Sequence, residues 1–235
     1  MNTLSGRALI IGAGKGLSAA VARRLAADGW QVDLSARDAD KLTGLCAETG
    51  ATAHTCDATD PDQVASLFAN LDRKGGAPTF VLYNPSYRAR GPITDLDPGE
   101  VRKAIEVSAF GGFLVAQQAA KRMLDAGSGA IFFTGASASV KGYANSSSFA
   151  MGKFALRGLA QSLARELHPQ GIHVAHFVID GGIAADHREG RQNTDTAPDR
   201  WLEPDAIAET YMAILGQHRS AWTWEVEIRP WGETF

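Results

Sequence analysis

Hydrophobic positions along the chain come in short runs that alternate with longer stretches of helical spacing. Seven short runs rich in apolar, β-branched or aromatic residues predict strands: Arg7–Ile11, Gln31–Ser35, Thr52–Cys56, Thr79–Tyr83, Ala130–Thr134, His173–Ile179 and Trp222–Ile228. Between most of them, apolar residues recur at helical spacing, as in Leu17–Ala27 and Phe154–Leu167, and Pro98–Leu124 predicts one long helix. This alternation predicts a single α/β domain over residues 1–235, a doubly wound parallel sheet with helices on both faces.

A glycine-rich stretch, "GAGKGLS", lies between the first predicted strand and the first predicted helix. Glycine lets the backbone turn sharply and approach a ligand closely, and the N-terminus of a helix favours negative charge. The position of this stretch predicts a dinucleotide-binding loop. Its candidate cofactor contacts are Gly12, Gly14, Lys15, Gly16 and Leu17.

The end of the second predicted strand indicates which dinucleotide is bound. An NAD site usually has a carboxylate there for the ribose 2′-hydroxyl, but the sequence reads "LSARD", with Ala36 and Arg37 in that place. Together with Lys15, Arg37 would attract a 2′-phosphate, which its planar guanidinium can bind through two hydrogen bonds. The alternative is that both cations are solvated surface charges. The pattern favours NADP(H).

Composition excludes several other classes of function. The chain has 235 residues, 45% of them hydrophobic, and a net charge of -3, so it can bury a full core and carries no basic patch for nucleic acid or an anionic membrane. Its two cysteines, Cys46 and Cys56, fit neither a disulfide framework nor a metal motif, and we expect them to be buried. The sequence shows no signal peptide and no run of about 20 apolar residues, so we expect a cytoplasmic protein.

The chain resembles the short-chain dehydrogenase/reductase family, which has a Rossmann-like fold, over nearly its whole length. The longest match is "GKFALRGLAQSLARELHPQGIHVAHF", Gly152–Phe177. The glycine-rich loop is also similar, although Ile11 replaces a threonine and Ser18 the last glycine. The resemblance implies an oxidoreductase that acts on a small molecule, and a homo-dimer or homo-tetramer.

The resemblance also implies further cofactor contacts. In "CDATD", Asp57 would face the adenine amine and Ala58 the ring. In "YNPS", Asn84 is the residue retained from the family's Asn-Asn-Ala-Gly. In "IDGGI", which stands in place of a Pro-Gly motif, Ile183 is the preferred contact for the nicotinamide.

The catalytic positions of the family are largely substituted in this chain. Its Asn, Ser and Tyr align with Ser108, Ala136 and Phe149, and only the Lys is retained, as Lys153. This resembles a divergent branch that has Phe for Tyr. In the family the Tyr gives the proton, the Lys lowers the Tyr pKa and holds the nicotinamide ribose, and the Ser polarises the carbonyl. Because a positioned acid contributes about 10²–10⁴-fold and an oxyanion donor about 10²–10³-fold, we expect slow reduction of ordinary ketones.

Three explanations of the substituted site remain open. A nearby side chain could donate the proton, Tyr143 being the most capable; the other candidates are Ser137, Ser139, Ser147, Ser148 and His187. The substrate could be an imine or enone, which needs no proton from Tyr. Finally, the protein could bind NADP without fast catalysis, as a sensor or partner subunit.

Two other segments carry predictions. The polar stretch Gly181–Arg200 follows a strand end, where ligands of this architecture bind, and is expected to form a flap over the site. Trp222 and Trp224 are expected on one face of the last strand, lining either an interface, which we favour, or a substrate pocket. His173 and His176 are expected on opposite faces of their strand, packed rather than binding metal.

Overall fold

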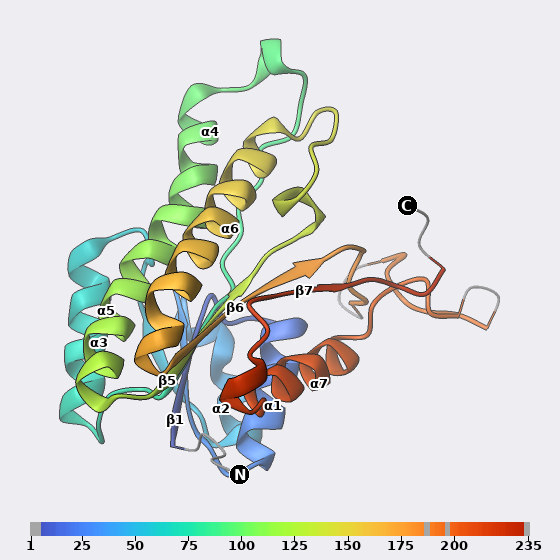
Figure 1. Cartoon of the computed structure of the whole chain (residues 1–235). Coiled ribbons are helices and arrows are strands. Elements are labelled where there is room, and N and C mark those ends of the chain that lie inside the picture. The colour runs from blue at the N-terminus through green and yellow to red at the C-terminus, as the bar shows by residue number, and fades with distance from the viewer. Residues whose placement is uncertain (1–5, 186–188, 196–197, 233–235) are drawn as a thin grey trace.

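The computed structural model describes residues 6–185, 189–195 and 198–232 and contains one seven-stranded parallel sheet (Figure 1). The strands are β1 Arg7–Ile11, β2 Gln31–Ala36, β3 Thr52–Thr55, β4 Phe80–Tyr83, β5 Gly129–Thr134, β6 Ile172–Ile179 and β7 Glu225–Ile228. Their order in the sheet is β3-β2-β1-β4-β5-β6-β7, and every neighbouring pair is parallel. The predicted single-domain α/β fold is confirmed.

Helices cover both faces of the sheet. They are α1 Leu17–Ala27, α2 Thr43–Thr49, α3 Pro61–Arg73, α4 Pro98–Ile105, α5 Gly111–Ala126, α6 Ser147–Leu167 and α7 Pro204–Leu215. Helices α1, α2 and α7 lie against one another on one face, whereas α3, α5 and α6 cover the other (Figure 1). Because side chains alternate along a strand, Ala8 and Ile10 belong to one core cluster and Leu9 and Ile11 to the other.

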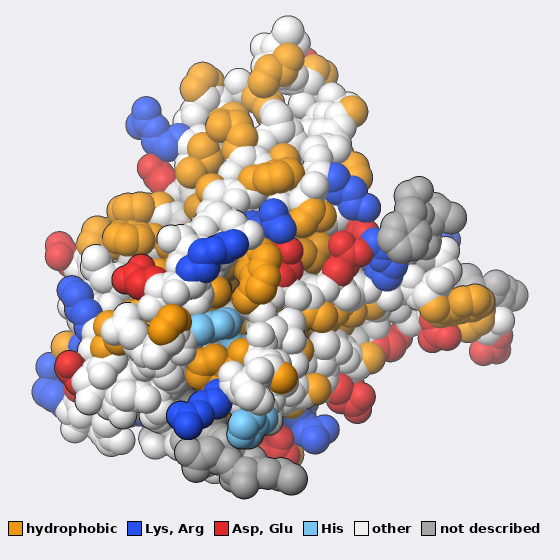
Figure 2. Space-filling model, in the orientation of Figure 1, with side chains coloured by type: hydrophobic (Ala, Val, Ile, Leu, Met, Phe, Trp, Pro, Cys, Tyr) orange, Lys and Arg blue, Asp and Glu red, His pale blue; other side chains and the backbone are white. Residues whose placement is uncertain are grey.

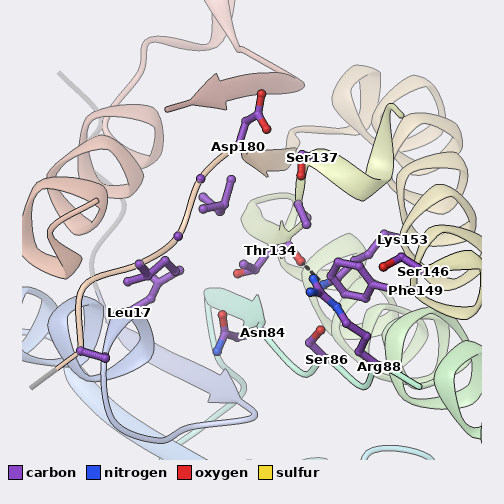
Figure 3. Close-up of a pocket in the computed structure, with 18 of the residues that line it drawn as sticks. Leu17, Asn84, Ser86, Arg88, Thr134, Ser137, Ser146, Phe149, Lys153 and Asp180 are labelled. Carbon is purple, nitrogen blue, oxygen red and sulfur yellow. Dashed lines mark hydrogen bonds between the residues drawn. The ribbon is translucent and has the colours of Figure 1, made fainter. Parts of the chain in front are cut away.

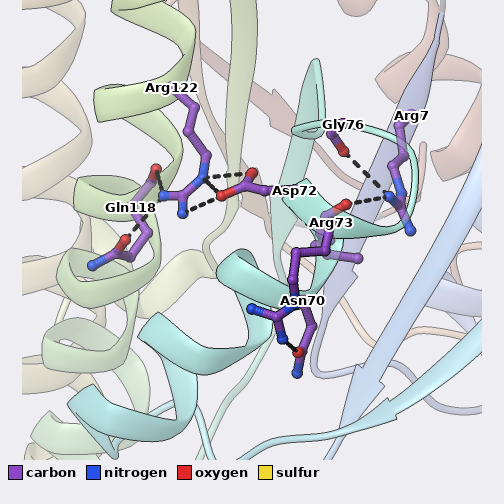
Figure 4. A network of polar contacts seen from close by, with 8 residues as sticks. Arg7, Asn70, Asp72, Arg73, Gly76, Gln118 and Arg122 are labelled. Carbon is purple, nitrogen blue, oxygen red and sulfur yellow. Dashed lines mark hydrogen bonds and ion pairs between the residues drawn. The ribbon is translucent and has the colours of Figure 1, made fainter.

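Polar contacts tie the helices of the second face together. Arg122 of α5 binds the carboxylate of Asp72 in α3, with its Nε 2.9 Å from each oxygen, and also binds Gln118 one turn earlier (Figure 4). Arg7 of β1 donates to the carbonyl of Leu71 at 2.8 Å and is paired with the buried Asp33. Burial raises the pKa of Asp33, but hydrogen bonds with His54 and Arg7 lower it by more, so the pKa is lowered overall.

The predicted helix Pro98–Leu124 is interrupted, and that prediction is corrected here. A π-helical turn, Glu106–Phe110, separates α4 from α5. The hydroxyl of Tyr83 donates to the carbonyl of Val107 within this turn at 2.6 Å. A π turn adds a residue to the helix and so changes which side chains face the neighbouring helix, α6.

The C-terminal strand is shorter than predicted, because β7 begins only at Glu225. Trp222 and Trp224 therefore precede the strand and do not share one of its faces. Trp222 stacks on His173 with ring centroids 4.7 Å apart, whereas Trp224 packs against the core on the other side and beneath the guanidinium of Arg157. The two indoles bind this segment to β6 and α6 within the monomer.

Candidate functional site

Two adjoining cavities lie along the carboxyl ends of β1 and β4, where the chain leaves the sheet in opposite directions. Their volumes are about 1090 and 1140 Å³, and Lys15, Asn84 and Ser86 line both. Ligands of open α/β sheets bind at this switch point. The two cavities together form an elongated cleft, whose ends we call the adenosine end and the reacting end after the ligand parts predicted there.

The glycine-rich loop between β1 and α1 is built for close approach. Gly12 has a φ of 74°, and a Cβ there would lie 2.7 Å from the ring of Pro85, so only glycine fits without strain. Ser18 closes the loop, since its hydroxyl lies 2.9 Å from the amide nitrogen of Gly14 and 3.0 Å from its carbonyl oxygen. Asn84 donates to the Gly12 carbonyl at 3.2 Å. The substitution of the family's last glycine by Ser18 thus stabilises the turn.

The N-terminus of α1 faces the cleft. Gly16 precedes the helix and supplies no side-chain cap, so the first amide groups of the helix are available to an anion. Gly16 and Leu17 line the reacting end, and Gly14 lines the adenosine end. The binding of a pyrophosphate at this helix terminus stays a prediction.

Cations line the adenosine end. Lys15 and Arg37 are exposed there, and among the described residues neither forms an ion pair. The neighbouring carboxylate, Asp38, is instead paired with Lys41 at 2.9 Å. Among the described residues, the charges of Lys15 and Arg37 at this end are therefore not neutralised by an ion pair.

The adenine-side residues predicted from the resemblance lie in the same wall. Asp57 and Ala58 line the adenosine end directly after β3. One carboxylate oxygen of Asp57 accepts from the amide and hydroxyl of Thr59, at 2.9 and 2.8 Å, and this fixes the turn. The second carboxylate oxygen remains available to a ligand.

At the reacting end, helix α6 places Phe149 and Lys153 one turn apart in the cavity wall (Figure 3). The ammonium of Lys153 is buried and donates to the carbonyl of Thr134 at 2.8 Å. Burial, with a smaller contribution from the positive charge of Arg88, lowers the pKa of Lys153 to about 7. Lys153 can therefore exchange a proton near neutral pH.

The structure brings together the residues at three of the four positions that align with the family's catalytic residues. Ala136 lines the reacting end with Phe149 and Lys153, but Ser108 does not. Ser108 lies in the π turn and is fully buried; its hydroxyl has no hydrogen-bond partner, and a Cβ on Gly152 would lie 3.0 Å from it. Packing of the π turn against α6 encloses this side chain, so Ser108 aligns with a catalytic position without lining the cleft.

The candidate proton donors differ in their access to the cavity. Tyr143 lines the reacting end and is 47% exposed, and Ser137 lines it as well. Ser148 instead donates to the carbonyl of Ala89 at 2.6 Å, and Ser139 accepts from the amide of Ala136. Ser147 lines neither cavity, and His187 lies outside the described residues.

Three arginines at the reacting end were missed by the sequence analysis. Arg88 and Arg90 come from the loop after β4, and Arg191 from the segment after β6. The guanidinium carbon of Arg88 lies 3.7 Å from the centre of the Phe149 ring. The sequence "YRARG" could have indicated two of them, because it repeats arginine directly after a strand that ends at the edge of the sheet where ligands bind.

The segment predicted as a flap begins in contact with the cleft. Ile183, the predicted nicotinamide contact, lines the reacting end and pairs with Leu202 in an isolated parallel bridge. The amide of Ala184 donates to the Leu202 carbonyl at 2.8 Å. Asp180 precedes them and binds both Lys141 and Arg229 at 3.0 Å. The described part of this segment is held by backbone pairing, and its closure over a ligand stays a prediction.

The described ranges contain neither a metal-binding cluster nor a membrane-spanning helix. Within them, no group of three or more His, Cys, Asp and Glu side chains could hold a metal ion. Nor does any helix in that part of the chain have the length and apolar character to cross a membrane. Both cysteines are free thiols; Cys56 is buried as expected, but Cys46 is only partly buried.

Known proteins are similar to this chain in sequence and in fold. A family model described as short chain dehydrogenase matches residues 7–195. The chain is 30% identical over 178 residues to the 3-oxoacyl-(acyl-carrier-protein) reductase MabA of Mycobacterium tuberculosis, covering 76% of this chain and 69% of that protein. It is 31% identical over 183 residues to the cyclic-di-GMP-binding biofilm dispersal mediator protein of Escherichia coli, covering 76% and 73% of the two chains.

Solved structures align with nearly the whole chain. A short-chain dehydrogenase from Rhodopseudomonas palustris has a TM-score of 0.82 at 34% identity, covering 96% of this chain and 99% of the other. A metagenomic short-chain oxidoreductase in complex with NADP also has a TM-score of 0.82, at 26% identity, covering 97% and 99%.

Proposed function

The protein belongs to the short-chain dehydrogenase family, an oxidoreductase family, and from this premise we propose that it is an NADP(H)-dependent oxidoreductase of a small molecule. The observation that carries the proposal is the continuous cleft at the switch point of the sheet. Its adenosine end offers the unpaired cations Lys15 and Arg37, and its reacting end contains Lys153.

The residues of the cleft fit the proposed cofactor. The glycine-rich loop leaves no room for a side chain at Gly12, and the uncapped N-terminus of α1 suits a pyrophosphate. Arg37 would bind the 2′-phosphate through its planar fork, Asn84 and Ile183 would contact the nicotinamide end, and Lys153 would hold the ribose. When bound, the nicotinamide supplies the hydride.

The proton for a reduced oxygen must come from another group, because the side chains of Phe149 and Ala136 carry no hydrogen-bond donor. Tyr143 is our proposed donor, since its phenol is exposed in the wall of the reacting end. Lys153, with a pKa lowered to about 7, would replenish protons at neutral pH. Replacing Tyr143 by Phe should then lower the turnover number about 10²–10⁴-fold, while Ser137→Ala leaves it within about twofold.

The first experiment is a titration of NADPH and NADH against the purified protein, followed by a panel of imines, enones and ketones. We expect NADPH to bind more tightly than NADH and to be oxidised by part of the panel. Arg37→Gln should weaken NADPH binding about 10–100-fold and leave NADH binding unchanged, because it removes charged hydrogen bonds to a phosphate. Arg102→Gln, an exposed arginine of α4 remote from both cavities, is the matched control. Equal binding of the two cofactors would contradict the proposal.

A second candidate function is an NADP-binding sensor or partner subunit without fast catalysis. The specific observation in its favour is the replacement of two hydroxyl positions by Ala136 and Phe149 at an otherwise complete cleft. One relative of similar identity is also named for binding a signalling nucleotide. Tight NADPH binding without oxidation by any member of the panel would support this function over the first.

We further propose that the protein is a homo-dimer or homo-tetramer. Large apolar side chains are exposed on neighbouring helical segments, Phe110 and Phe113 around the start of α5 and Met151 and Phe154 on α6. Figure 2 shows hydrophobic side chains gathered over α4 and α6. Exposed apolar patches of this kind mark protein interfaces.

A further inference from the structure

The reacting end of the cleft contains a concentration of positive charge beyond what the proposed cofactor site uses. Lys15 and the N-terminus of α1 lie on the pyrophosphate side, whereas Arg88 and Arg90 enter from the loop after β4. Arg191 comes from the segment after β6 and is close enough to repel Arg88. Three guanidinium groups from two distant segments thus meet in one part of the cavity.

Arg88 is held in place by a ring rather than by an acid. Its guanidinium lies over Phe149, 3.7 Å from the ring centre, and beside the ammonium of Lys153 (Figure 3). Among the described residues, no carboxylate forms an ion pair with Arg88 or Arg90. When the face of a guanidinium stacks on an aromatic ring, its N–H groups remain free at the edge for an anion.

The loop that carries the two arginines is anchored. Ser148 donates to the carbonyl of Ala89, between them, at 2.6 Å, and Gly91 donates its amide to the Asn145 carbonyl at 3.2 Å. Both anchors lie at or beside the start of α6. The arginines are therefore preorganised, which lowers the entropic cost of binding a ligand.

In the part of the chain that the structure describes, no acid of the wall is left to balance this charge. Among the described residues that line the reacting end, Asp180 is the one carboxylate, and it is already bound to Lys141 and Arg229. Burial, Arg90 and Arg191 all lower the pKa of Arg88, so the folded protein bears the cost of like charges and desolvation. An anionic ligand in the cavity would offset the repulsion between these like charges.

We propose that the reacting end binds an anionic oxyacid group of the substrate, a carboxylate or phosphate, through the free edge of Arg88, with Arg90 and Arg191 beside it. The inference that the bound anion belongs to a substrate rests on the proposed oxidoreductase function, whereas the inference that an anion binds does not. Phe149 acquires a role here, because its ring supports the guanidinium where the family has a hydroxyl. The preferred substrate is then a small molecule whose reducible group lies next to a carboxylate or phosphate.

The direct test is calorimetric titration of the NADP⁺-saturated protein with oxalate, with inorganic phosphate and with the neutral analogue oxamide. We expect saturable binding of at least one anion, weakened by salt, and no binding of oxamide. Arg88→Gln should weaken anion binding at least tenfold, Arg88→Lys should weaken it less, and Arg102→Gln should not change it. Whichever of oxalate and phosphate binds more tightly identifies the oxyacid class. The inference would be overturned if no anion bound, or if the Arg88→Gln variant bound the anion as tightly as the wild-type protein.

A second measurement separates this inference from the proposed function. NADPH oxidation is followed with a 2-oxo acid and with its ethyl ester, and we expect kcat/KM to favour the acid. Arg88→Gln should reduce the ratio of acid to ester about 10–100-fold without weakening NADPH binding. Turnover of the ester alone would refute anion selection and leave the oxidoreductase function intact. Anion binding without NADPH oxidation by either compound, or by any member of the panel of imines, enones and ketones, would retain the anion site and contradict the oxidoreductase function. A loss of NADPH affinity equal to the loss of anion affinity would assign Arg88 to the cofactor instead.

Discussion

The ammonium group of Lys153 lies where water hardly reaches it, and its surroundings decide its charge. It is 2% exposed, donates to the carbonyl of Thr134, and has Arg88 beside it. Burial disfavours the charged form, so the pKa is lowered to about 7 from an ordinary value of 10.5. A pKa lowered towards neutrality makes proton exchange between this group and a ligand easier than for an ordinary lysine.

Replacement of Lys153 by Met tests this perturbation through stability. The unfolded chain binds the proton up to about pH 10.5, whereas the folded protein releases it above about pH 7. Between these values the unfolded state holds more protons, so stability rises with pH by up to about 1.4 kcal/mol per unit. Urea unfolding at pH 7, 8 and 9 should show this rise in the wild-type protein and its loss in Lys153→Met. Parallel pH profiles would show that the lysine titrates normally.

At the scale of elements, the shape of the cleft depends on how closely the helix pair α4–α5 approaches α6. Gly152 of α6 lies against the π turn, and an added Cβ would lie 2.8 Å from the Ala104 carbonyl and 2.9 Å from the Ser108 side chain. Both distances are shorter than real Cβ atoms accept. The absence of a side chain at Gly152 therefore sets the position of α6, which carries Phe149 and Lys153.

Alanine at Gly152 should accordingly destabilise the protein although alanine is the better helix former. We expect a loss of about 1–3 kcal/mol in the free energy of unfolding, because the helices must separate. Gly158→Ala on the same helix, where a Cβ meets nothing within 4 Å, should instead stabilise the protein by about 0.5–1 kcal/mol. Denaturant unfolding of the two variants measures the contrast. Equal effects at the two positions would contradict close helix packing.

At the scale of the whole molecule, the outer surface of the helices near the reacting end is the proposed contact between copies of the chain. Phe113 is 43% exposed and stacks with Phe110 at a centroid distance of 6.3 Å, and Met151 is 51% exposed. Met151 belongs to α6, which forms part of the wall of the cleft through Phe149 and Lys153. A contact between copies through this surface would hold that wall in place.

Glutamate at Phe113 tests the proposed oligomer. A charge in an apolar contact is costly to desolvate, so sedimentation velocity should show Phe113→Glu shifted towards the monomer. Ala47→Glu places the same charge on α2, on the opposite face of the sheet, and should sediment like the wild-type protein. A wild-type protein that sediments as a monomer at all concentrations would refute the oligomer.

The sequence by itself determined the features that depend on local periodicity. Alternating strands and helices predicted the parallel sheet, and the position of "GAGKGLS" after β1 predicted the loop at its carboxyl end. A spacing of four residues places Phe149 and Lys153 on one face of α6, and both line the reacting end. Such features follow from residues near in sequence, because backbone hydrogen bonding fixes the geometry over one turn or one strand.

Tertiary structure alone decided which distant side chains meet. Arg88 reaches Phe149, and Trp222 stacks on His173, because the sheet order brings these loops together. Ser108 aligned with a catalytic position, yet the π turn and the absence of a side chain at Gly152 bury its hydroxyl. No local pattern encodes such contacts, because they depend on loop paths and helix separations that the packing of the complete chain sets.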